Sequence, residues 1–268
     1  MEKIGFIGSG NMAEAIIKGV ITAKVYKPEN VMLSDIREER LEFLAGKYGV
    51  KVFSENSRLA AHVDVLVLSV KPQHMNDALK SIKDAVDSVK LVISIAAGIK
   101  ISRIASVLGD IAIIRVMPNT PALIGEGAAA LFANEPAKKL LDKATSIFSA
   151  VGKTVVVEDE GMIDAVTALS GSGPAYFFLL MEEMIKAGVE LGLPEETAKD
   201  LVLQTAKGAG LLASHADKNA ESPALLRKRV TSPGGTTEAA IKVFNEANFG
   251  PMVYAALKKA YERSIELS

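Results

Sequence analysis

The chain has 268 residues, of which 49% are hydrophobic and 24% charged, which suits one or two globular domains with buried cores. The formal net charge of −1 argues against nucleic acid as a partner, because proteins that bind it carry a basic surface. The absence of cysteine excludes disulfides and thiolate metal sites, and the three widely spaced histidines, His62, His74 and His215, predict no metal site.

Short apolar segments alternate with amphipathic segments through the first part of the chain. The apolar segments are rich in Val and Ile and nearly continuous, as in parallel strands covered on both faces; they are 3–7, 31–34, 63–69, 91–95, 111–116 and 154–157. Helical periodicity is found at 11–23, 37–48 and 137–150. The alternation predicts an α/β fold, with an N-terminal Rossmann-type parallel-sheet domain at residues 1–160 that binds a dinucleotide.

Residues 161–268 lack strand patterns and predict an all-α C-terminal domain for substrate binding and dimerisation. The expected helices are 174–191, 194–216, 223–230, 236–247 and 251–267. The first of these is apolar on more than one face, with more apolar surface than a domain of about 100 residues can bury internally. Burial against the first domain is one explanation, and a subunit interface is the one we favour. The longest apolar runs fall short of the ~20 residues that cross a bilayer, and no basic leader is visible. A cytoplasmic protein without membrane contact is expected.

A dinucleotide fingerprint lies near the beginning of the chain. Gly8, Gly10 and Ala13 form G-x-G-x-x-A, directly after a predicted strand and at the start of a predicted helix. Gly8 permits a tight turn, Gly10 lets a pyrophosphate approach the backbone, and Ala13 allows close packing of helix and strand. The alternative is a tight turn that binds nothing, and the further strands behind it make that alternative weak.

The end of the second strand should select the cofactor. Asp35 suits the 2′-hydroxyl of NADH, whereas Arg37 suits the 2′-phosphate of NADPH, so the signal is divided. We expect NADPH, with Arg37 turned toward the phosphate and Asp35 turned to solvent. Three later loops also follow strand ends, where ligands of such folds bind: 69–72, 95–98 and 117–121.

A second glycine-rich segment, 229–237, lies between two predicted helices. Its glycines and hydroxyl residues before a helix start predict an anion pocket suited to a carboxylate, although a plain helix connection with a Thr cap is the alternative. Neither Lys nor His occurs at 167–183 or 231–241, so a general base for alcohol oxidation is missing. Reduction of an imine needs no such base, and a hydroxyl donor near the imine nitrogen would suffice.

These motifs together resemble the pyrroline-5-carboxylate reductases. The resemblance covers essentially the whole chain and rests on GFIGSGNMAEAI, SVKPQ, SIAAGI, RVMPNTPALIGEG, AVTALSGSGPAYFF and VTSPGGTTEAAI. It implies reduction of 1-pyrroline-5-carboxylate to L-proline, the final step of proline biosynthesis, with NADPH as cofactor and NADH as an alternative. It also implies a homodimer of intertwined helical domains, which in this family often assembles into a decamer.

The resemblance also implies roles for individual residues. Substrate contacts fall at Ser232, Gly234, Gly235, Thr236 and Thr237, with Thr237 near the ring nitrogen as the catalytic residue and the loop amides on the carboxylate. Cofactor contacts fall at Phe6, Ile7, Gly8, Ser9, Gly10, Asn11, Met12, Ser34, Asp35, Arg37, Asn56, Ser69, Val70, Lys71, Pro72, Ile95, Ala96 and Ala97.

Two other functions fit part of the pattern. A β-hydroxyacid dehydrogenase has a similar two-domain plan, but the lysine expected on the helix after the Gly171–Gly173 loop is missing. A non-catalytic dinucleotide sensor would need only the first glycine-rich site, and the second would then have no role.

Overall fold

The computed structural model describes residues 2–87, 90–217 and 221–267. The chain divides into two compact units. The first runs up to Pro174 and also includes the residues from Lys259 onward, and the second is Ala175–Lys258.

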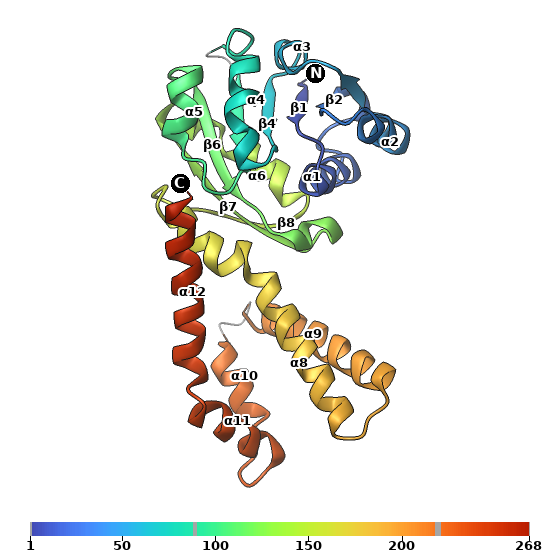
Figure 1. The fold of residues 1–268 in the computed structure, drawn as a ribbon, viewed down its shortest axis with the longest axis vertical. Helices are drawn as coiled ribbons and strands as arrows, with labels where there is room; N and C mark the ends of the chain where they lie inside the picture. Colours follow the sequence, from blue (N-terminus) through green and yellow to red (C-terminus); the bar gives the residue numbers. More distant parts are fainter. Residues whose placement is uncertain (1, 88–89, 218–220, 268) are drawn as a thin grey trace. The chain divides into compact units, whose positions relative to one another are not determined.

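The first unit is built on one sheet. Within the described residues the sheet has eight strands in the order β3-β2-β1-β4-β5-β6-β7-β8, and every neighbouring pair is parallel except β6 and β7 (Figure 1). The strands are β1 Ile4–Ile7, β2 Val31–Ser34, β3 Lys51–Phe53, β4 Val65–Leu68, β5 Leu91–Ser94, β6 Ala112–Met117, β7 Gly127–Ala133 and β8 Gly152–Val156. The first six strands from the β3 edge, in the order 3-2-1-4-5-6, have the order of a dinucleotide-binding fold.

Helices cover both faces of this sheet (Figure 1). One apolar core joins the strands to α1 Asn11–Thr22, α2 Glu38–Tyr48 and α6 Leu141–Ser149. The opposite core joins them to α3 Asn56–Ala61, α4 Met75–Ile82 and α5 Ile101–Leu108. Strand β4 serves both cores, because Val65 and Val67 face one and Leu66 and Leu68 the other. This explains why the predicted strands are continuously apolar.

Shorter helical segments connect these elements. The 3₁₀ segments are Pro28–Asn30, Pro72–His74, Thr120–Ile124 and Glu135–Leu140. Helix α7, Met162–Val166, is followed by a π-helical turn, Thr167–Gly171. Part of the helix expected at 137–150 is therefore 3₁₀ in character, since α6 starts only at Leu141.

The α/β fold and the Rossmann-type sheet predicted from the sequence are confirmed, with three differences in detail. Strands β3 and β7 were not predicted, and β7 is antiparallel to β6. The first compact unit continues past residue 160 as far as Pro174. The reason is that Ile163 and Ala168 are buried and the Asp164 carboxylate lies 3.8 Å from the guanidinium of Arg115 on β6.

The second unit is helical. Its helices are α8 Gly173–Glu190 from Ala175 onward, α9 Glu195–Asp217, α10 Pro223–Arg229, α11 Thr236–Glu246 and the part of α12 (Phe249–Glu266) up to Lys258. Large apolar side chains on α8 remain uncovered in the single chain: Phe177, Phe178 and Leu179 are 65%, 60% and 59% exposed. Such a surface indicates association with another apolar surface.

One stretch among the described residues, Met162–Glu190, is long and apolar enough by length and composition to cross a membrane. Only 22% of its apolar window is buried in the single chain. One such helix is weak evidence for a membrane span, because a helix that buries its apolar side chains against protein has the same composition.

The two helices nearest the glycine-rich turn are joined by a charge cluster around Glu14 on α1. Its carboxylate accepts hydrogen bonds from Arg40, Lys47 and Tyr48 on α2, at 3.0 Å for Lys47 and 2.9 Å for Tyr48. Burial raises the pKa of Glu14, but these hydrogen bonds outweigh it and lower the pKa to about 2. The ionised carboxylate therefore stabilises the folded chain.

We predict that Glu14→Gln lowers the free energy of unfolding at pH 7 by about 2 kcal/mol, the scale of hydrogen bonds to a charged group. Because folding lowers the pKa, the stabilisation is complete above the ordinary value of 4.5 and disappears as the pH falls toward 2. Urea denaturation from pH 7 to pH 2.5 should show the parent and Glu14→Gln converging. The exposed glutamate in Glu42→Gln serves as control, and a difference independent of pH would contradict the prediction.

Candidate functional site

The turn between β1 and α1 has the geometry that the fingerprint predicted. Gly8 has φ +91°, and a Cβ atom there would lie 2.8 Å from the Ser69 carbonyl oxygen, so neither its conformation nor its surroundings admit a side chain. At Gly10 a Cβ would meet no atom within 4 Å. The first glycine therefore packs the turn against the loop after β4, and the second leaves open space beside the start of α1.

Ser9, between these glycines, is held from both sides. Its backbone N–H and its hydroxyl donate to the Asp35 carboxylate at 2.7 and 2.8 Å. Its carbonyl oxygen accepts from Arg40 Nε at 2.8 Å. Ser9 is fully buried, so the role seen in the structure is to fix the turn rather than to present a side chain to a ligand.

Asp35 differs from our expectation. Its side chain is only 7% exposed, against 59% for Arg37, so the carboxylate is turned inward and not to solvent. Arg37 donates to it through the backbone N–H, Nε and Nη2. Burial raises the pKa of Asp35, but the hydrogen bonds from Arg37 and Ser9 hold it well below its ordinary value. The physical reason is that Ser9, 26 positions earlier, supplies two donors which the sequence alone does not reveal.

The loops after the other strands meet the same turn. The Ser69 hydroxyl donates to the carbonyl oxygens of Ile7 and Gly8, at 3.0 and 2.7 Å. The Ser34 hydroxyl donates to Asn56 Oδ1 at 2.6 Å. The amide of Ile95 donates to the Leu68 carbonyl at 3.1 Å and so extends the β4–β5 pairing. The structure thus brings the predicted loops of β1, β2, β4 and β5 together at one edge of the sheet.

Not every residue predicted to contact the cofactor presents its side chain there. Phe6, Ile7 and Ser34 are buried within their strands, and Ala96 is part of the apolar core. These positions can contact a ligand mainly through the backbone. Asn11, Lys71 and Pro72 are exposed, while Gly10 and Met12 are partly exposed.

A hollow of about 670 Å³ lies beside the loop after β2. Arg37 and Arg40 line it together with Phe43, and the Arg40 guanidinium lies 5.5 Å from the Phe43 ring. Arg37 bridges this hollow and the Asp35 carboxylate. Two guanidinium groups beside an aromatic ring suit a phosphorylated ribose and its base. Glu38 and Glu39 also line the hollow, and both arginines are paired with carboxylates, so a phosphate would compete with these acids for the guanidinium groups.

The residues of this turn fit a dinucleotide. Gly10 is the N-cap of α1 and supplies no side chain to its amides, so the first N–H groups of the helix are left for a ligand. The space beside Gly10 is where a pyrophosphate can approach these amides. The only acid of the first turn, Glu14, is paired with Arg40 and Lys47, so it adds little repulsion.

The second predicted site lies at the start of α11. Gly235 is the N-cap of this helix and Gly234 has φ +71°. Helical geometry leaves the amides of Thr236 and Thr237 without acceptors inside the helix. The amide of Gly234 donates to the Glu238 carboxylate at 2.8 Å, and that of Gly235 to the Ser232 carbonyl at 3.0 Å. Two of the amides expected to hold a substrate carboxylate are therefore engaged within the loop.

The sequence places Asn119 in the loop 117–121 after a predicted strand but gives no signal for the role of its side chain. Asn119 Nδ2 donates to the carbonyl and the hydroxyl of Ser170 at 3.2 and 3.3 Å, and its Oδ1 accepts from the Ala128 amide at 2.8 Å. It thereby ties the loop after β6 to the π-helical turn. Arg40 was likewise missed, because its position on a charged helix face gives no signal.

The fold and the open glycine-rich turn define a dinucleotide-dependent oxidoreductase. A family model described as NADP oxidoreductase, coenzyme F420-dependent, matches residues 3–98, and one for pyrroline-5-carboxylate reductase dimerisation matches residues 160–267. The pyrroline-5-carboxylate reductase of Pseudomonas aeruginosa is 45% identical, with 99% of this chain and 97% of the relative covered. The chain belongs to the pyrroline-5-carboxylate reductase family.

Solved structures of this family have the same fold over nearly the whole chain. A pyrroline-5-carboxylate reductase from Coxiella burnetii superposes with a TM-score of 0.92 at 42% identity, covering 100% of this chain and 98% of that one. The Plasmodium falciparum enzyme, solved with NADP bound, has a TM-score of 0.87 at 33% identity, with 99% and 98% covered. A ketol-acid reductoisomerase at 16% identity and a TM-score of 0.68 shares the fold alone.

We predict that Gly10→Val weakens dinucleotide binding at least tenfold, about 1.4 kcal/mol, because the new side chain fills the space beside the α1 amides. The fold should survive, since no atom lies within 4 Å of the added Cβ. Titration calorimetry with NADPH measures the affinity. Gly46→Val is the matched control, because Gly46 also faces open space but lies within α2. Equal affinities for both variants would refute the assignment.

Proposed function

We propose that this chain reduces 1-pyrroline-5-carboxylate to L-proline with NADPH, the final step of proline biosynthesis. The observation that carries the proposal is an open helix N-terminus behind the glycine-rich turn in a member of this reductase family. When bound, the dinucleotide supplies the hydride. The glycine-rich turn would hold its pyrophosphate, and the loop after β2 its 2′-phosphate.

The start of α11 would bind the substrate. The carboxylate of the substrate needs fixed hydrogen-bond donors so that the imine carbon is oriented for hydride transfer. The amides of Thr236 and Thr237 supply these donors. The amide of Gly234 becomes available to the substrate only if Glu238 releases it. The carboxylate of Glu238 thus occupies a donor that the substrate carboxylate can also use.

Thr237 is the proposed catalytic residue. When an iminium ion accepts hydride, its ring nitrogen loses a positive charge and becomes an amine. A fixed charge beside the nitrogen is therefore unnecessary, and a neutral hydroxyl can orient it. Thr237 is the second residue of α11, next to the carboxylate donors, and its side chain is partly buried, as this role requires.

The experiment that tests the function is loss of dinucleotide absorbance with pyrroline-5-carboxylate, measured in parallel with NADPH and NADH. Formation of proline in equal amount is the expected result. Absence of any turnover with either dinucleotide, in protein that binds NADPH, would favour a non-catalytic dinucleotide sensor.

Thr237→Ala should lower kcat/KM for the imine about 10²-fold, the low end for a group that handles a proton. Thr237→Ser keeps the hydroxyl and should retain most of the activity. Thr236→Ala is the matched control, because it changes the adjacent side chain but keeps the amide. Steady-state kinetics at saturating NADPH measures all three variants. If Thr237→Ala is as fast as the parent, only the backbone role of the loop survives.

We predict a preference for NADPH that depends on Arg37. Arg37→Ala should lower kcat/KM for NADPH roughly tenfold, about 1.4 kcal/mol, because the guanidinium no longer meets the 2′-phosphate. The value for NADH should change little. Arg58→Ala, an exposed arginine on α3, serves as control. A parent enzyme that prefers NADH would contradict this prediction.

We propose that the exposed apolar side chains of α8 form a homodimer interface, with a decamer as a further assembly, in the cytoplasm. Light scattering at micromolar concentration should give at least twice the chain mass of 28.4 kDa. Phe178→Glu, at a 60% exposed position, should weaken this association by placing a charge in the interface. An active monomer would show that α8 serves another purpose.

A further inference from the structure

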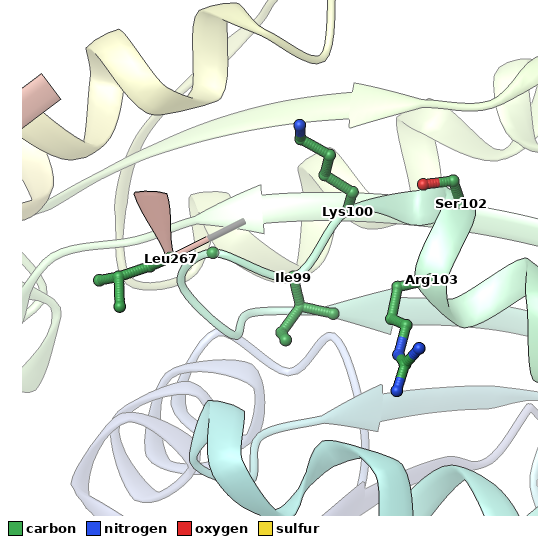
Figure 2. Close-up of a pocket in the computed structure, with 6 residues that line it drawn as sticks. Ile99, Lys100, Ser102, Arg103 and Leu267 are labelled. Atoms are coloured by element: carbon green, nitrogen blue, oxygen red, sulfur yellow. The ribbon is translucent and has the colours of Figure 1, made fainter. Parts of the chain in front are cut away.

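Leu267, the residue after the end of α12, packs on the loop that follows β5, and both belong to the first unit. Gly98 in this loop has φ +70°, and a Cβ there would lie 2.7 Å from the Leu267 carbonyl oxygen. Figure 2 shows Leu267 beside the loop that carries Ile99 and Lys100, at the edge of a hollow of about 500 Å³. Two segments far apart in the sequence are thus in direct backbone contact.

A buried polar chain lies next to this contact. The Ser264 hydroxyl of α12 donates to Asp164 Oδ1 at 2.7 Å, and Asp164 Oδ1 lies 3.8 Å from Arg115 Nη2. Arg115 Nη1 donates to Glu160 Oε1 at 3.2 Å. Arg115, Asp164 and Ser264 are 1%, 3% and 4% exposed. Burial of these charges requires that their mutual geometry be kept, because a displaced partner leaves an uncompensated charge.

Glu160 connects this chain to the loop after β5. Its Oε1 also accepts the backbone N–H of Ile101, the first residue of α5, at 2.7 Å. The N-cap residue of α5, Lys100, makes no side-chain hydrogen bond to the helix, so Glu160 takes the place of a local cap. The loop 95–100 is consequently held at one end by the β4–β5 pairing, at the other by Glu160, and at Gly98 by Leu267.

The place of this loop in the sheet points to its role. Strand β5 is paired with β4, which is paired with β1, so the loop lies at the same carboxyl edge as the glycine-rich turn. In such sheets a dinucleotide extends across this edge. With the pyrophosphate at the glycine-rich turn and the 2′-phosphate at the loop after β2, as proposed, the half that carries the hydride would extend to the other side of β1, where the loops after β4 and β5 lie.

We propose that Glu160 is a positioning residue for hydride transfer. Through the Ile101 amide, and together with Arg115, Asp164 and Ser264, it holds the loop 95–100 in the shape that orients the nicotinamide half of the dinucleotide. The proposal rests on the proposed function. It differs from a purely stabilising role, because it predicts a change in hydride transfer at full occupancy of folded enzyme.

The test compares Glu160→Ala with Glu160→Gln in the full chain. Glu160→Ala should lower kcat roughly tenfold or more, since small misplacements of reacting groups are costly, and should increase the isotope effect with 4-deuterated NADPH. The dissociation constant for NADPH should change by less than about twofold, since the pyrophosphate contacts remain. Glu160→Gln keeps the acceptor oxygen for the Ile101 amide and leaves Asp164 to compensate Arg115, so it should restore most of kcat. Glu266→Gln breaks an exposed ion pair with Arg263 in the same last turn of α12 and is the control.

Amide hydrogen exchange supplies a readout independent of turnover. In the dinucleotide-free protein, exchange of the peptide covering 95–101 should rise at least about tenfold in Glu160→Ala and stay at the parent level in both glutamine variants. If Glu160→Ala does not fold, Ser264→Ala, which removes a single hydroxyl, should show the same two effects in smaller degree.

The outcomes separate the two proposals. Unchanged kcat, isotope effect and exchange in the folded variants overturn the positioning role while leaving the reductase function intact. A second result also overturns the positioning role: kcat falls, the isotope effect is unchanged, and the number of NADPH-binding sites falls by the same factor. This combination is expected when part of the protein is simply unfolded. A parent protein without reductase activity overturns the proposed function, and hydrogen exchange then decides whether Glu160 orders the loop.

Discussion

The carboxylate of Asp35 determines the shape of the cofactor-binding edge. It accepts the amide and hydroxyl of Ser9, which are otherwise buried donors without water to satisfy them. This contact fixes the β1–α1 turn to the end of β2. With the turn in place, Gly8 can pack on the loop after β4 and Gly10 can leave the amides of α1 open. The ionised state of Asp35 is thus part of the fold before any ligand arrives.

Arg40 completes the arrangement from the opposite side. It donates to the Ser9 carbonyl and to Glu14, so the turn, α1 and α2 are joined by one guanidinium. A planar cation with several donors suits such a position, whereas a lysine would satisfy fewer acceptors. The turn is therefore preorganised, and a dinucleotide would bind without the cost of ordering it.

The sequence predicted those features whose cause is local. Gly8 and Gly10 were identifiable because a tight turn and a close backbone approach demand glycine at fixed spacing. The parallel strands were identifiable because burial on both faces makes each strand continuously apolar. Strand β7 escaped prediction because GAAALFA is rich in alanine, which has little strand preference, and its pairing with β6 and β8 supplies the stability.

The features that were missed depend on residues far apart in the chain. The inward orientation of Asp35 requires Ser9, and the capping of Ile101 requires Glu160, 59 positions later. The engagement of the Gly234 amide by Glu238 is closer in sequence, but the pattern S-P-G-G-T-T-E does not state which acceptor an amide chooses. A sequence motif shows where a binding site lies. Which hydrogen-bond partner each polar group takes there depends on its neighbours in space.

The discontinuity of the first unit has a consequence for its biogenesis. On the ribosome, Asp164 is synthesised one hundred residues before Ser264, its hydrogen-bond partner. In between, the helices of the second unit emerge, carrying the apolar side chains of α8. The nascent sheet can form its parallel core during translation, but its buried carboxylate and the loop at Gly98 stay incomplete until α12 has emerged. The coding sequence for the complete dinucleotide-binding unit therefore does not end with its last strand, β8, but also includes the segment for the end of α12.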